Sequence, residues 1–255
     1  MGNSFLTGDG PLKTVMIQVR TTKEALDEIQ SGLSQGADAF GLQVECLLGQ
    51  ERTEANLKKI FAAGAGKPFY VTDYCYDQNE GKSYDEIAEE LLFLARMGAA
   101  LIDIPGDFYC KDPDQLTYDE NAVKKQLNLI DAIHKCGAQV LMSSHIGDFR
   151  TEDYVLGVAF EQKRRGADIA KIVTFSHDDE QLSDNLKTVV RLKETLGIPF
   201  LFLTSGEKGR LQRLAGPLLG CCMWLCVAFR APITTQAQPL LSEINQFVDI
   251  MNSTK

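Results

Sequence analysis

Short apolar runs and longer helical patterns alternate eight times along the chain, and this order limits the possible folds more than any other feature. Strands that alternate with helices form a parallel sheet. Eight such units in 255 residues favour a closed barrel over an open doubly wound sheet, so we expect an α/β protein with one (β/α)8 TIM-barrel domain over residues 1–255. The expected strands are 13–19, 39–45, 68–72, 100–104, 139–143, 169–174, 199–203 and 218–227, and the expected helices are 21 or 22 to about 36, 53–63, 84–97, 119–135, 152–165, 179–196, 208–214 and 240–252.

Charge and cysteine usage restrict the partners that we expect. The net charge of −9 argues against nucleic acid or an anionic membrane surface, and an anionic substrate would need a local arginine or lysine. The seven cysteines are an odd number and lie mostly in apolar runs, which is typical of reduced thiols in a cytosol. Because there is no C-x-x-C pair and there are only three histidines, we do not expect a zinc site. No G-x-G-x-x-G motif follows any strand, so a dinucleotide cofactor is not expected either.

The start of the chain and its apolar runs indicate the cellular compartment in which the protein is expected. Residues 1–11 lack the basic start and apolar run of a signal peptide. No apolar run reaches the length of a membrane helix, and the longest, 218–229, is expected to be a buried element. We therefore expect a cytoplasmic protein with no membrane partner.

A lysine lies in the middle of an expected buried strand. Residues 166–174 read Gly-Ala-Asp-Ile-Ala-Lys-Ile-Val-Thr, which is typical of a helix end, a turn and a strand. The period of two places Ile169, Lys171 and Val173 on one face. Burial disfavours the charged form of a lysine, and a neutral amine is a nucleophile towards carbonyl groups. Either Lys171 forms a Schiff base, or it lies at a strand edge and its amine reaches solvent.

A second reactive side chain follows the neighbouring strand. In a barrel of this type, chemistry takes place at the carboxyl ends of the strands. The strand before Lys171 leads into Ser143-Ser144-His145, so His145 can lie close to the lysine. An imine-forming lysine and a proton-transferring histidine are the two parts of Schiff-base catalysis, although a histidine such as His145, taken alone, is more often a hydrogen-bonded structural residue. We expect His134 and His177 on a helix surface and in a loop.

Three late motifs carry a resemblance to a known family. They are Ser-Ser-His145, Gly-Ala-Asp-Ile-Ala-Lys171-Ile and Gly-Glu-Lys-Gly-Arg-Leu-Gln-Arg213-Leu-Ala-Gly. With these motifs, and over most of its length, the chain resembles the type I 3-dehydroquinate dehydratases. The resemblance implies a (β/α)8 barrel, usually dimeric, that converts 3-dehydroquinate to 3-dehydroshikimate without a metal or cofactor.

The resemblance also implies roles for single residues. Lys171 corresponds to the lysine that forms an imine with the substrate ketone. His145 corresponds to the histidine that assists imine formation, removes the proton next to the imine carbon and delivers it to the leaving hydroxyl. Arg213 matches the arginine that holds the substrate carboxylate. The loop glutamate that supports the histidine corresponds to Glu80 if a short insertion is allowed.

Several recognition positions depart from the family pattern. The family's Glu-x-Arg-x-Asp on the second strand reads Gly-Leu-Gln-Val-Glu at residues 41–45, and a tyrosine stands nearest to the arginine after the third strand. The acidic pattern of the fourth strand reads Asp-Ile-Pro-Gly at 103–106, and the Ser-x-x-x-Gln of the last loop begins with threonine. The residues expected to bind substrate, besides Arg213, are Gln43, Glu45, Tyr74, Thr234 and Gln238.

Three hypotheses about function follow. The first is a 3-dehydroquinate dehydratase, and the second is another Schiff-base lyase or aldolase that acts on a different oxo-acid. The third is a non-catalytic barrel that binds a metabolite or a partner. The loss of arginines that bind in a bidentate manner affects the expected substrate more than the expected chemistry.

Overall fold

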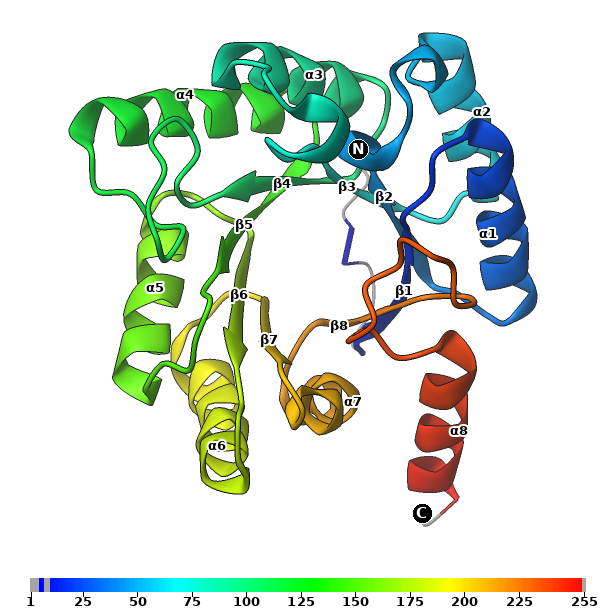
Figure 1. Ribbon diagram of the computed structural model, residues 1–255. Coiled ribbons are helices and arrows are strands. Elements are labelled where there is room, and N and C mark those ends of the chain that lie inside the picture. The colour runs from blue at the N-terminus through cyan, green and yellow to red at the C-terminus, as the bar shows by residue number, and fades with distance from the viewer. Residues whose placement is uncertain (1–4, 7–9, 254–255) are drawn as a thin grey trace.

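Eight parallel strands form a barrel wall with helices on its outside (Figure 1). The structure is a computed structural model that describes residues 5–6 and 10–253. Most of residues 1–11, on which the expectation about a signal peptide rests, lie outside the described residues. The strands are β1 (Leu12–Ile17), β2 (Ala39–Gln43), β3 (Phe69–Thr72), β4 (Leu101–Pro105), β5 (Gln139–His145), β6 (Ile169–Phe175), β7 (Phe200–Ser205) and β8 (Met223–Cys226). The helices are α1 (Thr22–Ser34), α2 (Glu54–Ala63), α3 (Tyr84–Arg96), α4 (Glu120–Lys135), α5 (Glu152–Arg164), α6 (Asp179–Thr195), α7 (Gly209–Leu219) and α8 (Leu241–Asn252), with short 3-10 turns η1 (Val44–Cys46), η2 (Gly49–Glu51) and η3 (Asp77–Asn79).

The strand order is β7-β6-β5-β4-β3-β2-β1-β8, and neighbouring strands in this order are parallel. Of the described strands, β7 and β8 form no ladder with each other, but the backbone N–H of Cys222 donates to the Phe200 carbonyl at 2.9 Å just before β8. The result is a nearly closed barrel, and the prediction of a TIM barrel is confirmed. No helix in the described part of the chain is long and apolar enough to cross a membrane.

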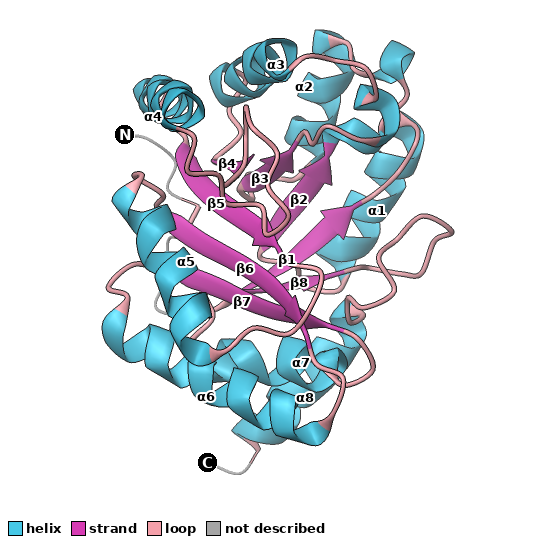
Figure 2. Cartoon of the chain, turned by 60° about the vertical axis from the view of Figure 1, so that its left-hand side comes forward, coloured by secondary structure: helices cyan, strands magenta, loops and turns pink. Residues whose placement is uncertain are grey.

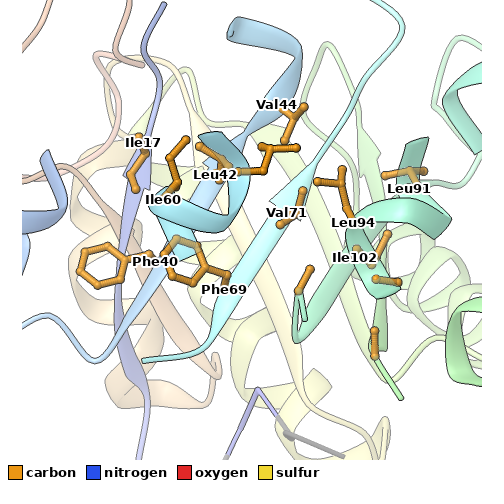
Figure 3. Packing of buried hydrophobic residues seen from close by; sticks show 14 of the residues in the cluster. Ile17, Phe40, Leu42, Val44, Ile60, Phe69, Val71, Leu91, Leu94 and Ile102 are labelled. Atoms are coloured by element: carbon orange, nitrogen blue, oxygen red, sulfur yellow. The ribbon is translucent and has the colours of Figure 1, made fainter. Parts of the chain in front are cut away.

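The helices lie on the outside of the strands (Figure 2). They pack on the strands through apolar stripes. In α3, a capping box between Ser83 and Glu86 begins the helix, and Ile87, Leu91 and Leu94 are buried on one face. These side chains meet those that point outward from the strands, among them the buried apolar residues of β2 and β3 (Figure 3). Because the outward positions of the strands are used for this core, the inward positions remain for the barrel interior.

The expected strand 218–227 is wrong in its first half. Helix α7 continues to Leu219 with Pro217 inside it, and β8 begins only at Met223. Proline usually ends a helical pattern, so the sequence favoured an early end for this helix. The apolar run then joins two elements, because the last turn of α7 and all of β8 are rich in apolar residues and periodicity alone does not separate them.

Candidate active site

Lys171 lies inside the barrel, in the middle of β6. Its side chain is almost fully buried, and the amine donates hydrogen bonds to Tyr70 Oη at 3.0 Å and Tyr74 Oη at 3.2 Å. It also forms an ion pair with Asp103 Oδ2 at 3.1 Å. The inward position follows from the two-residue period, and the alternative of a strand-edge lysine in solvent is wrong.

Asp103 on β4 supplies the counter-charge for the buried amine. Its Oδ2 accepts hydrogen bonds from Tyr70 and from Tyr74, the latter at 2.6 Å, and its Oδ1 accepts from Ser143 Oγ at 2.5 Å. Burial alone would raise the pKa of this carboxyl, but the Lys171 ammonium and the three hydroxyl donors outweigh it and hold the pKa of Asp103 below its usual value. Asp103 is therefore ionised, and a fully satisfied carboxylate makes the burial of an ammonium group tolerable.

His145 ends β5 beside this network. It pairs in register with Val173 on β6, and its ring meets the Tyr74 ring edge-on at a centroid distance of 5.8 Å. Burial, followed by the charges of Lys171 and Arg213, lowers the pKa of His145 to about 3, although Asp103 acts in the opposite direction. The imidazole is thus neutral at physiological pH and able to accept a proton.

The histidine's partner is not the residue expected from the sequence. Glu80 is exposed at the end of η3, which is held by Arg20 through Asp77 and by Arg52 through Asn79. The oxygen of the Gln115 side chain lies 2.8 Å from His145 Nδ1 instead. The expectation that Glu80 supports the histidine is therefore corrected: among the described residues it is Gln115, in loop 106–118 after β4, that forms this hydrogen bond to the ring of His145.

Arg213 is buried on α7, only 6% exposed, and is therefore not a surface arginine. Its Nε donates to the Thr204 carbonyl at 2.8 Å, and no other hydrogen bond of its guanidinium to a described residue is found. Gly209 allows this approach, because a Cβ there would lie 2.5 Å from the Thr204 carbonyl oxygen. Burial lowers the pKa of Arg213 to about 10, which leaves it charged at neutral pH and able to bind an anion.

A cleft opens beside His145 between the loops that follow β3 and β4. Its volume is about 410 Å³, and aromatic rings form much of its wall. The cleft gives a small molecule access to the side of the histidine. Its lining residues are Tyr74, Cys75, Tyr76, Tyr84, Pro105, Asp107, Phe108, Lys111, Gln115 and His145.

Comparison with known proteins shows the family to which the chain belongs. A family model described as type I 3-dehydroquinase matches residues 14–255. The chain belongs to this family. The 3-dehydroquinate dehydratase of Alkaliphilus oremlandii is 34% identical over 110 residues, which are 42% of this chain and 41% of that protein, so the match spans less than half of the relative. The catabolic 3-dehydroquinate dehydratase of Acinetobacter baylyi is 24% identical over 84% of this chain and 77% of that protein.

Solved structures of the type I 3-dehydroquinases share the fold. The crystal structure of 3-dehydroquinate dehydratase from Geobacillus kaustophilus has a TM-score of 0.81, with 18% identity over 97% of this chain and 93% of that one. The enzyme from Clostridium difficile has a TM-score of 0.80, with 15% identity over 97% and 95% of the two chains. At these identities the likeness concerns the barrel architecture alone.

In this member of the type I 3-dehydroquinase family, the side chains of the second strand differ from the family pattern. At Gly41, an added Cβ would lie 2.2 Å from the sulfur of Met16, so the Met16 side chain occupies the place that the family's glutamate would take. Gln43 accepts a hydrogen bond from Gln18 Nε2 at 2.7 Å. Gln18 in turn binds Thr235 in the last loop, so Gln43 takes part in a link between that loop and the barrel.

Glu45 lies just after β2, in η1, and not in the strand as expected. It is fully buried and accepts hydrogen bonds from Thr72 Oγ1 at 2.9 Å and Tyr76 Oη at 3.2 Å. Burial raises the pKa of Glu45 to about 7. Both of its described partners belong to β3 and the loop that follows it, so the carboxyl braces that loop.

Tyr74 and the last loop complete the expected binding residues. The hydroxyl group of Tyr74 donates a hydrogen bond to Asp103 and accepts one from Lys171. Thr234 Oγ1 donates to the Ala231 carbonyl at 2.8 Å within its own loop. Gln238 is buried, and its Oε1 has no hydrogen-bond partner in the described structure.

Sequence reasoning missed three residues around the lysine and histidine. Asp103 and Tyr70 point inward by the two-residue period of their strands, so parity could have found them. Gln115 lies in a loop without regular structure, and no sequence signal marks it beyond the length of that loop.

Proposed function

We propose that the protein is a lyase that dehydrates 3-dehydroquinate, or a close oxo-acid relative, through a Schiff base on Lys171. The observation that carries this proposal is the buried Lys171 amine paired with ionised Asp103 and flanked by a neutral histidine. The family membership supports the same chemistry. The homodimer and the cytoplasmic location stay predictions from the sequence.

In the proposed reaction, the Lys171 ammonium loses a proton and the resulting amine adds to the substrate ketone. The proton returns to the departing hydroxyl, so one water leaves as the protonated imine forms. His145 then removes a proton from the carbon next to the imine carbon. The same proton goes to the hydroxyl that departs from the neighbouring carbon, which releases a second water and forms the double bond. Hydrolysis of the imine consumes one water and returns the amine, so the net change is the loss of one water.

Arg213→Lys is expected to weaken substrate binding more than it slows the chemical step. A lysine cannot form the paired hydrogen bonds that a guanidinium makes with a carboxylate, and each lost charge-assisted bond is worth roughly 1.5–3 kcal/mol, or about ten- to a hundredfold in binding. Steady-state kinetics should therefore show a raised KM and a smaller change in kcat. Arg210→Lys, on the exposed face of the same helix, is the matched control. An unchanged KM in Arg213→Lys would contradict the carboxylate role.

The second candidate function is a Schiff-base lyase or aldolase for an oxo-acid that carries fewer hydroxyls. This candidate is favoured because the positions at which the family pattern binds substrate are taken up by contacts within the protein. Met16 fills the space at Gly41, Gln18 donates a hydrogen bond to Gln43, and Tyr74 donates one to Asp103. Two arginines of the family pattern are thereby replaced by neutral side chains.

We therefore expect poor efficiency on 3-dehydroquinate, with the imine step intact. Steady-state assays with this substrate test the expectation, and borohydride trapping with a panel of oxo-acids identifies the ketones that still form an imine. A kcat/KM at or above about 10⁵ M⁻¹s⁻¹, well inside the usual enzyme range, would show that the lost arginines do not matter. If no ketone in the panel traps Lys171, the non-catalytic barrel becomes the better hypothesis.

A further inference from the structure

We propose that Gln115 is a positioning residue that holds His145 in a single neutral tautomer, with the proton on Nδ1 and the lone pair on Nε2. The tautomer follows from hydrogen bonds alone, whereas its value for catalysis rests on the proposed function. The amide comes from the loop between β4 and α4. It contacts the histidine in place of the carboxylate of Glu80, which the sequence predicted as its partner.

Two contacts with one atom define the tautomer. Gln115 Oε1 lies 2.8 Å from the backbone nitrogen of His145 and 2.8 Å from the ring Nδ1 of the same residue. A backbone N–H can only donate, so the side-chain atom that receives it must be the amide oxygen and not the amide nitrogen. An amide oxygen can only accept, so the hydrogen of the second contact must be bonded to Nδ1. In a neutral imidazole the other nitrogen, Nε2, is then the base.

The loop that carries Gln115 is fixed from several sides. Gln115 adopts a left-handed conformation with φ of 50°, which is costly for a residue other than glycine and therefore has to be held in place. Its N–H donates to the Asp112 carbonyl at 3.0 Å, and its own carbonyl accepts from Ser144 Oγ at 2.8 Å. Gly106 lies so close that a Cβ there would be 2.5 Å from the Gln115 carbonyl oxygen.

A buried arginine holds the two ends of this loop together. The guanidinium of Arg165, at the end of α5, donates to the Gly106 carbonyl at 3.1 Å and to the Thr117 carbonyl at 2.6 Å. Its side chain is fully buried, and Glu161 provides its counter-charge at 2.7 Å. The amide of Gln115 is therefore placed before any substrate arrives.

The choice of an amide has an electrostatic consequence. The charged groups that act on His145 are Lys171 from β6, Arg213 from α7 and Asp103 from β4, and Tyr74 from the loop after β3 presents its ring. Two of these groups are cations, and the amide adds no negative charge to oppose them. A carboxylate at residue 115 would stabilise the imidazolium, so Gln115→Glu should raise the pKa of His145 and move the acid limb of the rate profile to higher pH.

Histidine NMR tests the proposal without any substrate. The chain has three histidines, so ¹⁵N-histidine spectra can be assigned by replacing His134 and His177 in turn. We expect His145 to show the Nδ1–H tautomer and to remain neutral at pH 5. Gln115→Glu should shift its titration upward by at least one pH unit, while Gln50→Glu, at an exposed glutamine in η2, should leave it unchanged. An Nε2–H tautomer in the unaltered protein would overturn the proposal, as would an unshifted titration in folded Gln115→Glu.

Kinetics then test the catalytic value of the tautomer. Gln115→Ala should lower kcat by about ten- to a hundredfold, with little change in KM, because the base is no longer oriented. An unaltered kcat in a folded Gln115→Ala protein would show that the positioning does not serve catalysis. If the unaltered protein fails to turn over any oxo-acid, the proposed function fails, but the NMR result still decides the tautomer.

Discussion

Replacing Lys171 by alanine is expected to abolish turnover, the largest effect of any single change. Without the amine no imine can form, and the rate advantage of covalent catalysis is lost completely. Mass spectrometry after borohydride reduction in the presence of substrate should show an adduct on the unaltered protein and none on Lys171→Ala. Lys187→Ala, at an exposed lysine on α6, should behave like the unaltered protein.

The fold of the Lys171 variant needs its own control. Removal of the lysine leaves Asp103 buried without its counter-charge, and breaking such a pair typically costs about 3–5 kcal/mol. The double variant Lys171→Met with Asp103→Asn removes both charges and should recover much of this stability, as thermal unfolding can measure. An adduct that persists on a different lysine would refute the assignment of Lys171.

Replacing His145 by alanine is expected to lower kcat by about 10²–10⁴-fold, the usual contribution of general acid–base catalysis. The imine should still form, so borohydride trapping should succeed while the release of water becomes slow. Single-turnover measurements separate these two steps. His177→Ala removes an exposed histidine that pairs with Asp148 and serves as the control. Near-normal turnover by His145→Ala would mean that this histidine is structural.

The inward residues of the strands could be predicted because the two-residue period is a local property of the chain. This period places Lys171 in the barrel interior, and the order of parallel strands places His145 next to it. Loop partners could not be predicted in the same way. Gln115 lies 30 residues before His145, and its position depends on Arg165 of α5, a contact that no local pattern specifies. The boundary between α7 and β8 was missed because one apolar run serves two elements.

The seam between β7 and β8 makes this barrel a sheet with two adjacent edges. Backbone groups at an edge open more easily than those inside a ladder, so local fluctuations should concentrate there and amide hydrogens should exchange fastest. Helix α7 connects the two edges and carries Arg213 (Figure 1). A ligand that binds Arg213 in the folded protein should therefore slow amide exchange along the seam, because binding to the native form stabilises it by mass action.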